Sequence, residues 1–373
     1  MGLVNTYLRR TAMIAAAVSM AAGLAACGSA GQAGDNADKA AEGKGKEKLT
    51  IGLLLPENQN ARYEKFDKPL IEAKVEELCD TCTVTYANAQ QDAATQQQQV
   101  DSMITKKVDV LILDAVDSKS IASSVKKADQ AGIPVVAYDR LAEGPISAYT
   151  SFDNEQVGKV QGEALLEKLG DKAGKGKIVM MNGSPTDPNA AMFKKGAHSV
   201  LDGKVKIGKE YDTEKWKPEN ANENMKGAIS SLGKKEIVGV YSANDGMASG
   251  IITALKAAGF DELPPVTGQD AELAGVQRIV SGEQFMSVYK AYGPEADAAA
   301  EMAVALARGE KLDAIAKDSV DSPTTEGVPS VLIAPVALTV DNIEDTVVKD
   351  GLYTVDEICT AKYAKACEKA GLM

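Results

Sequence analysis

The sequence predicts an α/β protein made of two similar parallel-sheet lobes, each with helices on both faces of its sheet. Three observations predict this. Apolar runs of strand length alternate with amphipathic helical segments, the alternation restarts near residue 154, and no linker rich in proline or serine separates the two halves. At 373 residues the chain is long enough for two domains of ordinary size. Halves joined so closely are expected to share several short crossings that together form a hinge.

The first lobe is expected to start with Leu49–Leu55, a nearly continuous apolar run that is typical of a strand buried on both faces. Helices and strands then alternate strictly, an order that favours a right-handed parallel sheet. The expected helices are 61–78, 93–106 and 118–131, and the expected strands are 83–87, 108–113 and 134–138.

The second lobe is expected to start with helix 154–169, in which Val157, Val160, Ala164 and Leu165 form one apolar stripe at helical spacing. The same alternation continues to residue 333. The expected helices are 189–201, 219–232, 246–258, 273–281 and 297–308, and the expected strands are 178–182, 205–211, 237–242, 265–269, 285–289 and 331–333.

Charge and histidine content exclude several classes of protein. With 41 basic and 53 acidic residues the net charge is −12, which disfavours binding to nucleic acid. His198 is the single histidine, which excludes multi-histidine metal sites and disfavours a serine or cysteine catalytic triad. No D-x-[DN]-x-[DN]-G pattern indicates a calcium loop. We therefore expect neither a metal nor a cofactor.

The N-terminus has the pattern of an export signal. Two arginines precede 16 uncharged residues, a run too short for a membrane span, so residues 1–26 are expected to be a cleaved signal peptide. Residues 24–28, L-A-A-C-G, resemble a bacterial lipobox, which would make Cys27 a lipidated N-terminus at the outer face of the cell membrane. A plain secretory peptide is the alternative. Residues 27–48 are almost free of large apolar side chains and are expected to be a flexible tether.

The four remaining cysteines are an even number, which favours disulfides in an exported protein. Cys79-x-x-Cys82 follows the first expected helix, and Cys359 and Cys367 bracket a short helical stretch near the C-terminus. Of the three possible connectivities we favour the local pairs, 79 with 82 and 359 with 367. A redox-active C-x-x-C is the alternative for the first pair, although thioredoxin-like surroundings are absent from the sequence.

Polar side chains follow most of the expected strands, at the position where ligands bind in open parallel sheets. They are mainly Asp, Asn, Arg, Lys and Gln, whose donors and acceptors suit vicinal hydroxyl groups. Helix capping is the alternative for each of Asp153, Asn189 and Asn244 taken singly. Trp216, the one tryptophan, lies in the polar loop E-K-W-K-P. We expect its ring to face a ligand, for example the C–H face of a sugar, with core filling as the alternative.

Seven of these segments carry a resemblance to a known family. They are Ala137–Arg140, Ser151–Glu155, Gly183–Asp187, Pro218–Ala221, Ala243–Gly246, Gly268–Glu272 and Val288–Lys290. Together they resemble the periplasmic sugar-binding proteins of ABC importers, and are most similar to the group of D-xylose-binding proteins and multiple-aldose receptors. The resemblance extends from Leu49 to about Gly351. It implies a type I periplasmic-binding fold, in which two lobes joined by three crossovers close on a sugar.

The resemblance also implies which residues contact the sugar. Polar contacts fall on Arg62, Asp139, Arg140, Asn189, Lys194, Asn244, Asp270 and Lys290, and aromatic faces on Trp216 and, from the other lobe, Tyr63. Two positions depart from the family pattern. Tyr63 stands where xylose receptors usually have tryptophan, and Lys194 stands where an arginine is common. A smaller stacking face and a point contact in place of a forked one leave the particular sugar open.

We assign 49–151 and about 291–322 to the first lobe, 152–290 and about 323–350 to the second, and 351–373 to a C-terminal tail. The protein is expected to be a monomeric binding protein, not an enzyme, that captures xylose or a related aldose such as glucose. It would hand the sugar to the permease of an ABC importer and touch the membrane only through its lipid anchor. The ATPase must be a separate chain, because no G-x-x-x-x-G-K-[ST] loop occurs here.

Three alternatives share parts of this pattern. A receptor for a furanosyl signalling molecule or another polyol would use the same fold. A glycosidase would use Asp139 and Asp270, but their expected cationic neighbours would keep both carboxylates ionised, whereas acid catalysis needs a raised pKa. The sensor half of a repressor is disfavoured by the lipobox and by the absence of a basic helix-turn-helix segment.

Overall fold

The computed structural model describes residues 48–373, and its first lobe is built on a seven-stranded sheet in the order β10-β11-β5-β4-β3-β1-β2. Neighbouring strands are parallel, apart from the antiparallel pair β10 and β11. The strands are β1 (Thr50–Leu55), β2 (Thr83–Asn88), β3 (Val110–Leu113), β4 (Val135–Tyr138), β5 (Ala148–Phe152), β10 (Asp318–Val320) and β11 (Val328–Ile333). The central strands β3 and β4 are buried along their whole length, as their apolar runs predict.

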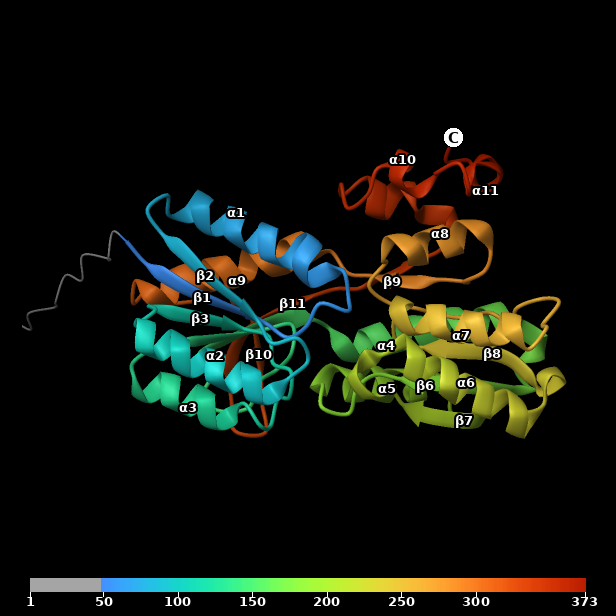
Figure 1. Cartoon of the computed structure of the whole chain (residues 1–373), viewed down its shortest axis with the longest axis horizontal. Helices are drawn as coiled ribbons and strands as arrows, with labels where there is room; N and C mark the ends of the chain where they lie inside the picture. Colours follow the sequence, from blue (N-terminus) through green and yellow to red (C-terminus); the bar gives the residue numbers. More distant parts are fainter. Residues whose placement is uncertain (1–47) are drawn as a thin grey trace, which may run out of the picture. The chain divides into compact units, whose positions relative to one another are not determined.

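Helices cover both faces of this sheet (Figure 1). α1 (Lys68–Leu78) and α9 (Tyr292–Ala307) share one buried cluster with Ile51 and Ile112 of the sheet. α2 (Ala93–Lys106) and α3 (Ala122–Gln130) lie on the opposite face, in a cluster with Leu54 and Leu111. Because neighbouring residues of one strand point to opposite faces, β1, β3 and β4 each contribute to both clusters.

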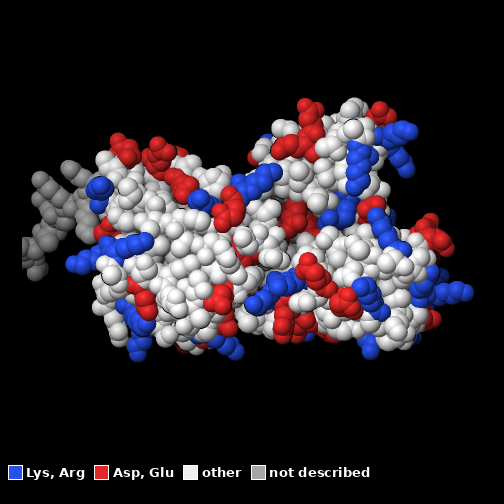
Figure 2. All heavy atoms as spheres, in the orientation of Figure 1, with Lys and Arg blue, Asp and Glu red and all other residues white. Residues whose placement is uncertain are grey.

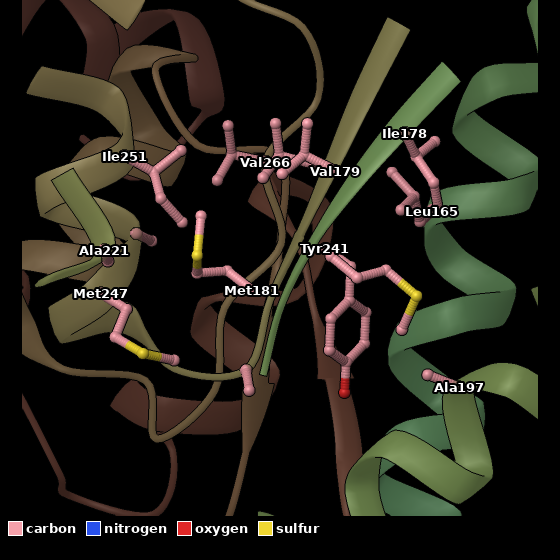
Figure 3. Close-up of a cluster of buried hydrophobic side chains, with 14 of the residues drawn as sticks. Leu165, Ile178, Val179, Met181, Ala197, Ala221, Tyr241, Met247, Ile251 and Val266 are labelled. Atoms are coloured by element: carbon pink, nitrogen blue, oxygen red, sulfur yellow. The ribbon is translucent and has the colours of Figure 1, made fainter. Parts of the chain in front are cut away.

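The second lobe has the same three-layer arrangement around a smaller parallel sheet, β7-β6-β8. Figure 3 shows Val179, Met181 and Val266 between Leu165 on one side and Ile251 on the other. Isolated bridges at Val266 and Gln269 connect this sheet to the antiparallel pair β9 and β12. The elements are α4 (Asn154–Leu169), β6 (Lys177–Asn182), α5 (Pro188–Leu201), β7 (Lys206–Asp212), α6 (Pro218–Leu232), β8 (Ile237–Ser242), α7 (Asp245–Ala257), α8 (Leu273–Ser281), β9 (Ser287–Tyr289) and β12 (Val336–Leu338).

Within residues 48–373 the chain passes between the two sheets three times, after β5, after β9 and after β11. The last crossing lies later than the sequence analysis placed it. β11 runs parallel to β5 from Ser330 to Ile333, so the residues before 334 complete the first sheet, whereas we had assigned everything from about 323 to the second lobe. Without β11, the backbone N–H and C=O groups on that edge of β5 would have no partners in the sheet. The returning segment satisfies them by adding a strand.

The C-terminal tail packs on the second lobe. α10 (Val355–Ile358) and α11 (Ala364–Ala370) both contact α8 (Figure 1). Disulfides join Cys79 to Cys82 and Cys359 to Cys367 in the structure, which is the local connectivity that we favoured. The second bridge is buried among apolar side chains of α8 and the tail.

Two stretches differ from the expected strands. Residues 148–152 form the strand β5, which is absent from the strands expected above. Residues 265–269 make isolated bridges instead of a regular strand. The expected signal peptide, the lipidated Cys27 and nearly all of the tether lie outside the described residues.

The surface of the described part carries both signs of charge. On the face shown in Figure 2, lysine and arginine side chains are interspersed with acidic ones over both lobes. None of the helices in residues 48–373 has the length and apolar character needed to cross a membrane.

Candidate functional site

A polar cavity lies between the two lobes. Its lining residues follow the carboxyl ends of strands in both sheets, where open parallel sheets bind ligands. From the first lobe they are Asn60, Arg62, Tyr63, Asp139 and Arg140, and from the second Asp187, Asn189, Phe193, Trp216, Asn244, Gln269, Asp270 and Lys290. The structure thus brings together every expected contact residue except Lys194.

Four lining residues were missed by sequence reasoning. Asp187 and Gln269 stand inside two of the segments that carry the family resemblance, and Asn60 lies in the loop after β1, so the same positional argument applies to them. Phe193 gives a different signal. It lies four residues after Asn189 on α5, and side chains at that spacing share one face of a helix.

A π-helical turn orients Arg62. η1 (Tyr63–Asp67) follows this arginine, and the wide turn brings the Asp67 carboxylate back to the guanidinium, with Nε to Oδ2 at 2.8 Å and Nη2 to Oδ1 at 3.2 Å. The guanidinium also donates to Asp139 Oδ1 at 3.2 Å and to Glu295 Oε2 at 2.7 Å. Because all of these groups are buried, Arg62 is held in a single orientation at the edge of the cavity.

Asp139 is held in its ionised form. Burial alone would raise the pKa of its carboxyl group, but the nearby charges of Arg62, Lys290 and Arg140 lower the pKa below its ordinary value. The carboxylate is therefore an acceptor only, which suits the hydroxyl donors of a sugar. A carboxylate with a lowered pKa is unsuited to the acid catalysis of a glycosidase.

Asp187 connects the lobes. Its carboxylate lies 2.9 Å from Arg140 Nε of the first lobe and accepts a hydrogen bond from Trp216 Nε1 at 3.1 Å. It also caps α5 by accepting from the backbone N–H of Asn189 at 2.9 Å. Because Arg140 and Asp187 belong to different lobes, this buried ion pair exists only when the lobes are together.

The Trp216 ring lies against the backbone of Gly183. A Cβ atom on Gly183 would come within 2.0 Å of the ring, so glycine is required for this close approach. Phe193 meets the indole edge to face, with ring centroids 6.4 Å apart and an interplanar angle of 64°. Trp216 packs on the core of the second lobe, which is the alternative that we weighed, and it also lines the cavity.

Asn189 and Asn244 make hydrogen bonds from one lobe to the other. Asn189 Nδ2 donates to the backbone carbonyl of Asp139 at 3.0 Å, and Asn244 Nδ2 donates to Asn60 Oδ1 at 3.1 Å. Asn244 Oδ1 also accepts from the backbone N–H of Met247 at 2.8 Å, which is the capping role that we weighed. Both amides therefore act in closing the lobes as well as in lining the cavity.

Asp270 and Lys290 form a buried pair on the second lobe, with Nζ and Oδ1 2.9 Å apart. Beside them, Gln269 Oε1 is buried and has no hydrogen-bond partner among the described residues. A buried amide oxygen without a partner costs free energy. This oxygen is therefore suited to accept from a hydroxyl group of a ligand.

Backbone strain is concentrated around the cavity. Of the non-glycine residues with positive φ, Asp139 (53°), Trp216 (56°) and Asp270 (87°) line the cavity, and Lys215 and Ala271 are their neighbours in sequence. Such conformations cost on the order of 1–3 kcal/mol each and persist where the surrounding structure requires them. Here they aim the side chains of three loops at one point.

The charges around the cavity balance. Three cations, Arg62, Arg140 and Lys290, face three carboxylates, Asp139, Asp187 and Asp270. An uncharged ligand needs no excess of either sign, and the three aromatic rings of Tyr63, Phe193 and Trp216 provide the apolar surface that C–H groups require. Within residues 48–373 no group of three or more His, Cys, Asp or Glu side chains is arranged to hold a metal ion.

Lys194 does not line the cavity. Its Nζ lies 2.8 Å from Glu210 Oε1 and 3.4 Å from Asp212 Oδ1, both on β7 at the surface of the second lobe. The flexible side chain of Lys194 lets its ammonium group, a compact point charge, pair with both carboxylates. Our assignment of Lys194 as a contact residue is therefore wrong for this arrangement of the side chain.

We expect Lys194→Ala to leave the affinity for sugar within about twofold of the wild-type value, because exposed ion pairs contribute little. Isothermal titration of both proteins with the sugar that binds best measures this difference. A loss of affinity of tenfold or more would indicate that Lys194 contacts the sugar.

Asp245 supports the site from behind. Its buried carboxylate accepts from Gln284 Nε2 at 2.6 Å, from Ser287 Oγ at 2.9 Å and from the backbone N–H of Glu272 at 2.9 Å. These bonds join the loop that carries Asn244 to the loop that carries Asp270. Burial raises the pKa of Asp245 from 3.8 to about 7.

This pKa predicts a pH dependence of stability. The folded protein keeps the Asp245 proton up to about pH 7, whereas the unfolded chain loses it near pH 4, so stability from this group is complete below about pH 4 and is lost as the pH rises to 7. Because asparagine stays uncharged at every pH, we expect the melting temperature of wild type minus that of Asp245→Asn to fall steadily as the pH rises from 4 to 7. A difference that is constant over this range would contradict the assignment.

Comparison with known proteins shows the family of this chain. The model of the periplasmic binding protein domain matches residues 51–311. The chain is 37% identical over 318 residues to the D-xylose-binding periplasmic protein of Escherichia coli, an alignment that covers 84% of this chain and 93% of that protein. It is 32% identical to the multiple sugar-binding periplasmic receptor ChvE of Rhizobium radiobacter, again over 84% of this chain and 93% of the relative.

A solved structure agrees with this result. An ABC transporter solute-binding protein from Clostridium phytofermentans with bound β-D-glucose has a TM-score of 0.76 and 29% identity, and the match covers 83% of this chain and 99% of that one. These relatives are sugar-binding receptors, not enzymes. The resemblance and the fold expected from the sequence are thereby confirmed, and the chain belongs to the periplasmic binding protein family.

Proposed function

We propose that this protein captures one neutral monosaccharide, D-xylose or a related aldose such as D-glucose, and delivers it to the permease of an ABC importer. The observation that carries the proposal is the cavity between the lobes, lined by balanced charges, by amides and by three aromatic rings. The names of the relatives support the sugar class. They also support an extracytoplasmic location.

In this proposal the sugar hydroxyl groups exchange water for the carboxylates of Asp139 and Asp270, the guanidinium groups of Arg62 and Arg140, and the ammonium of Lys290. The C–H surface of the sugar packs against Trp216. The direct bonds between the lobes, such as the pair of Arg140 and Asp187, supply part of the free energy of closure. Sugar contacts made only in the closed arrangement supply the rest, so binding shifts the hinge equilibrium.

Three further elements complete the proposal. The lipidated Cys27 would hold the protein at the outer face of the membrane, the protein would act as a monomer, and the permease would recognise the closed pair of lobes. The ATPase that drives transport would be a separate chain.

A sugar panel tests the proposed function. Thermal unfolding of the purified protein is measured with D-xylose, D-glucose, D-galactose, L-arabinose, D-ribose and the acyclic polyol xylitol. A ligand at about 100 times its Kd adds about 2.7 kcal/mol of stability. We expect one or two pyranose sugars to raise the melting temperature while their epimers do not, because sites that read hydroxyl groups reject the wrong stereochemistry strongly. A response to xylitol alone would favour the polyol receptor, and no response to any of the six would contradict the proposal.

A further inference from the structure

The C-terminal tail belongs to the second lobe, but one of its rings reaches the first. Tyr353 is 3% exposed and shares a buried cluster with Val276 and Ile279 of α8. The tail is fastened to α8 by a hydrogen bond from Gln277 Nε2 to the carbonyl of Glu357 at 3.0 Å, and by the apolar packing around the bridge between Cys359 and Cys367.

On its other side Tyr353 touches the π-helical turn η1 of the first lobe. The Phe66 ring meets the Tyr353 ring edge to face, with centroids 5.8 Å apart and an angle of 73°. Lys65 Nζ lies 4.8 Å from the centroid of the same tyrosine ring. Because η1 starts directly after Arg62, this contact joins the tail to the segment that carries a cavity residue.

A second aromatic ring, that of Tyr292, connects Phe66 to two residues that line the cavity. Phe66 stacks on Tyr292, with centroids 5.6 Å apart and an angle of 28°. The Arg62 guanidinium lies 4.6 Å from the centroid of Tyr292, and the Tyr292 hydroxyl donates to the backbone carbonyl of Asp270 at 2.6 Å. The row of rings Tyr353–Phe66–Tyr292 therefore ends on one cavity residue from each lobe.

We propose that Tyr353 is a positioning residue of the sugar site, an inference that rests on the function proposed above. Its ring holds Phe66, and Phe66 holds Tyr292, so that Arg62 and the strained backbone of Asp270 keep the geometry that contacts the sugar. Because Tyr353 and Phe66 belong to different lobes, their contact is also part of the closed arrangement. Its loss shifts the hinge equilibrium away from the state that binds.

Trp216 provides the readout for the test. It is the one tryptophan in the sequence and lines the cavity, so its fluorescence reports binding directly. D-xylose and D-glucose are titrated into the wild type, Tyr353→Phe, Tyr353→Leu, Phe66→Leu and the double variant. We expect Tyr353→Leu to raise the Kd about tenfold, which corresponds to about 1.4 kcal/mol, and Tyr353→Phe to stay within about twofold of wild type because it keeps the ring.

Two comparisons separate positioning from a loss of folded structure. Leu372→Ala removes a buried side chain from the same tail cluster but from no ring contact, so it should lower the melting temperature without changing the Kd. The double variant should bind about as well as Phe66→Leu alone, because Phe66→Leu already removes the contact with Tyr353. Additive effects in the double variant, or equal affinities of wild type and Tyr353→Leu, would overturn the inference. A wild-type protein that binds neither sugar would instead overturn the proposed function, and the inference with it.

Discussion

We expect Asp270→Ala to abolish sugar binding. In the closed arrangement Asp270 pairs with Lys290 at 2.9 Å, and both side chains are buried. Without the carboxylate, closure buries an ammonium group that has lost its partner, at a cost of roughly 3–5 kcal/mol for a broken buried pair. Since about 1.4 kcal/mol is tenfold in affinity, the Kd should rise by at least about 100-fold. Titration followed by Trp216 fluorescence measures it.

The backbone at Asp270 makes Asp270→Asn an informative companion. Its φ of 87° is unfavourable for alanine, whereas asparagine adopts positive φ more readily. Asp270→Asn should therefore fold normally and still lose about 100-fold in affinity because the charge is gone. Asp212→Ala, an exposed carboxylate on β7, is the matched control and should bind as wild type does. Wild-type affinity in a well-folded Asp270→Asn variant would contradict this role.

Arg140→Ala should have an effect of similar size, for a different reason. Arg140 contacts Asp187 of the other lobe, donates to Tyr63 Oη at 3.2 Å and donates to the carbonyl of Ala115 at 3.0 Å. Its removal leaves the buried Asp187 carboxylate without its cation and loosens the acceptor of the Trp216 indole. We expect a loss of at least about 100-fold in affinity, because a buried carboxylate without its partner costs free energy; the same titration measures it.

Lysine at this position tests the forked geometry. Arg140→Lys keeps the charge but reaches fewer partners than the guanidinium, which contacts Asp187, Asp114, Tyr63 and Ala115, so we expect it to recover only a small part of the affinity. Arg308→Ala, at the end of α9 far from the cavity, is the control for loss of an arginine. Full recovery in Arg140→Lys would show that charge alone is needed.

Most helices and buried strands follow from the sequence because local pattern and tertiary structure agree there. Helices 93–106, 154–169 and 273–281 and strand 237–242 have the expected bounds, since apolar periodicity and capping residues mark them directly. β5 escaped notice because A-Y-T-S-F has no strict alternation and its polar residues are buried by hydrogen bonds. Residues 265–269 have a strand-like composition but make only bridges.

The candidate site could be predicted as a set of loops but not as a set of contacts. Position after a strand and the family resemblance together found nine of the thirteen lining residues, because parallel strands all deliver their loops to the same edge. Sequence position could not show that the side-chain amides of Asn244 and Asn189 donate hydrogen bonds to the other lobe. It therefore could not distinguish these residues from those whose polar atoms have no protein partner. Nor could it show that Lys194 turns to Glu210 while Phe193, one residue earlier on α5, faces the cavity. Neighbouring helix residues point about 100° apart, so that choice depends on the exact helix phase.

A crystal structure of the protein grown with the sugar that gives the largest thermal shift tests the central claim most directly. The account predicts one sugar ring between the lobes, with its C–H face on Trp216 and its hydroxyl groups within 3.2 Å of Asp139, Asp270 and Gln269 Oε1. A sugar bound elsewhere on the surface, with this cavity filled only by water, would contradict it.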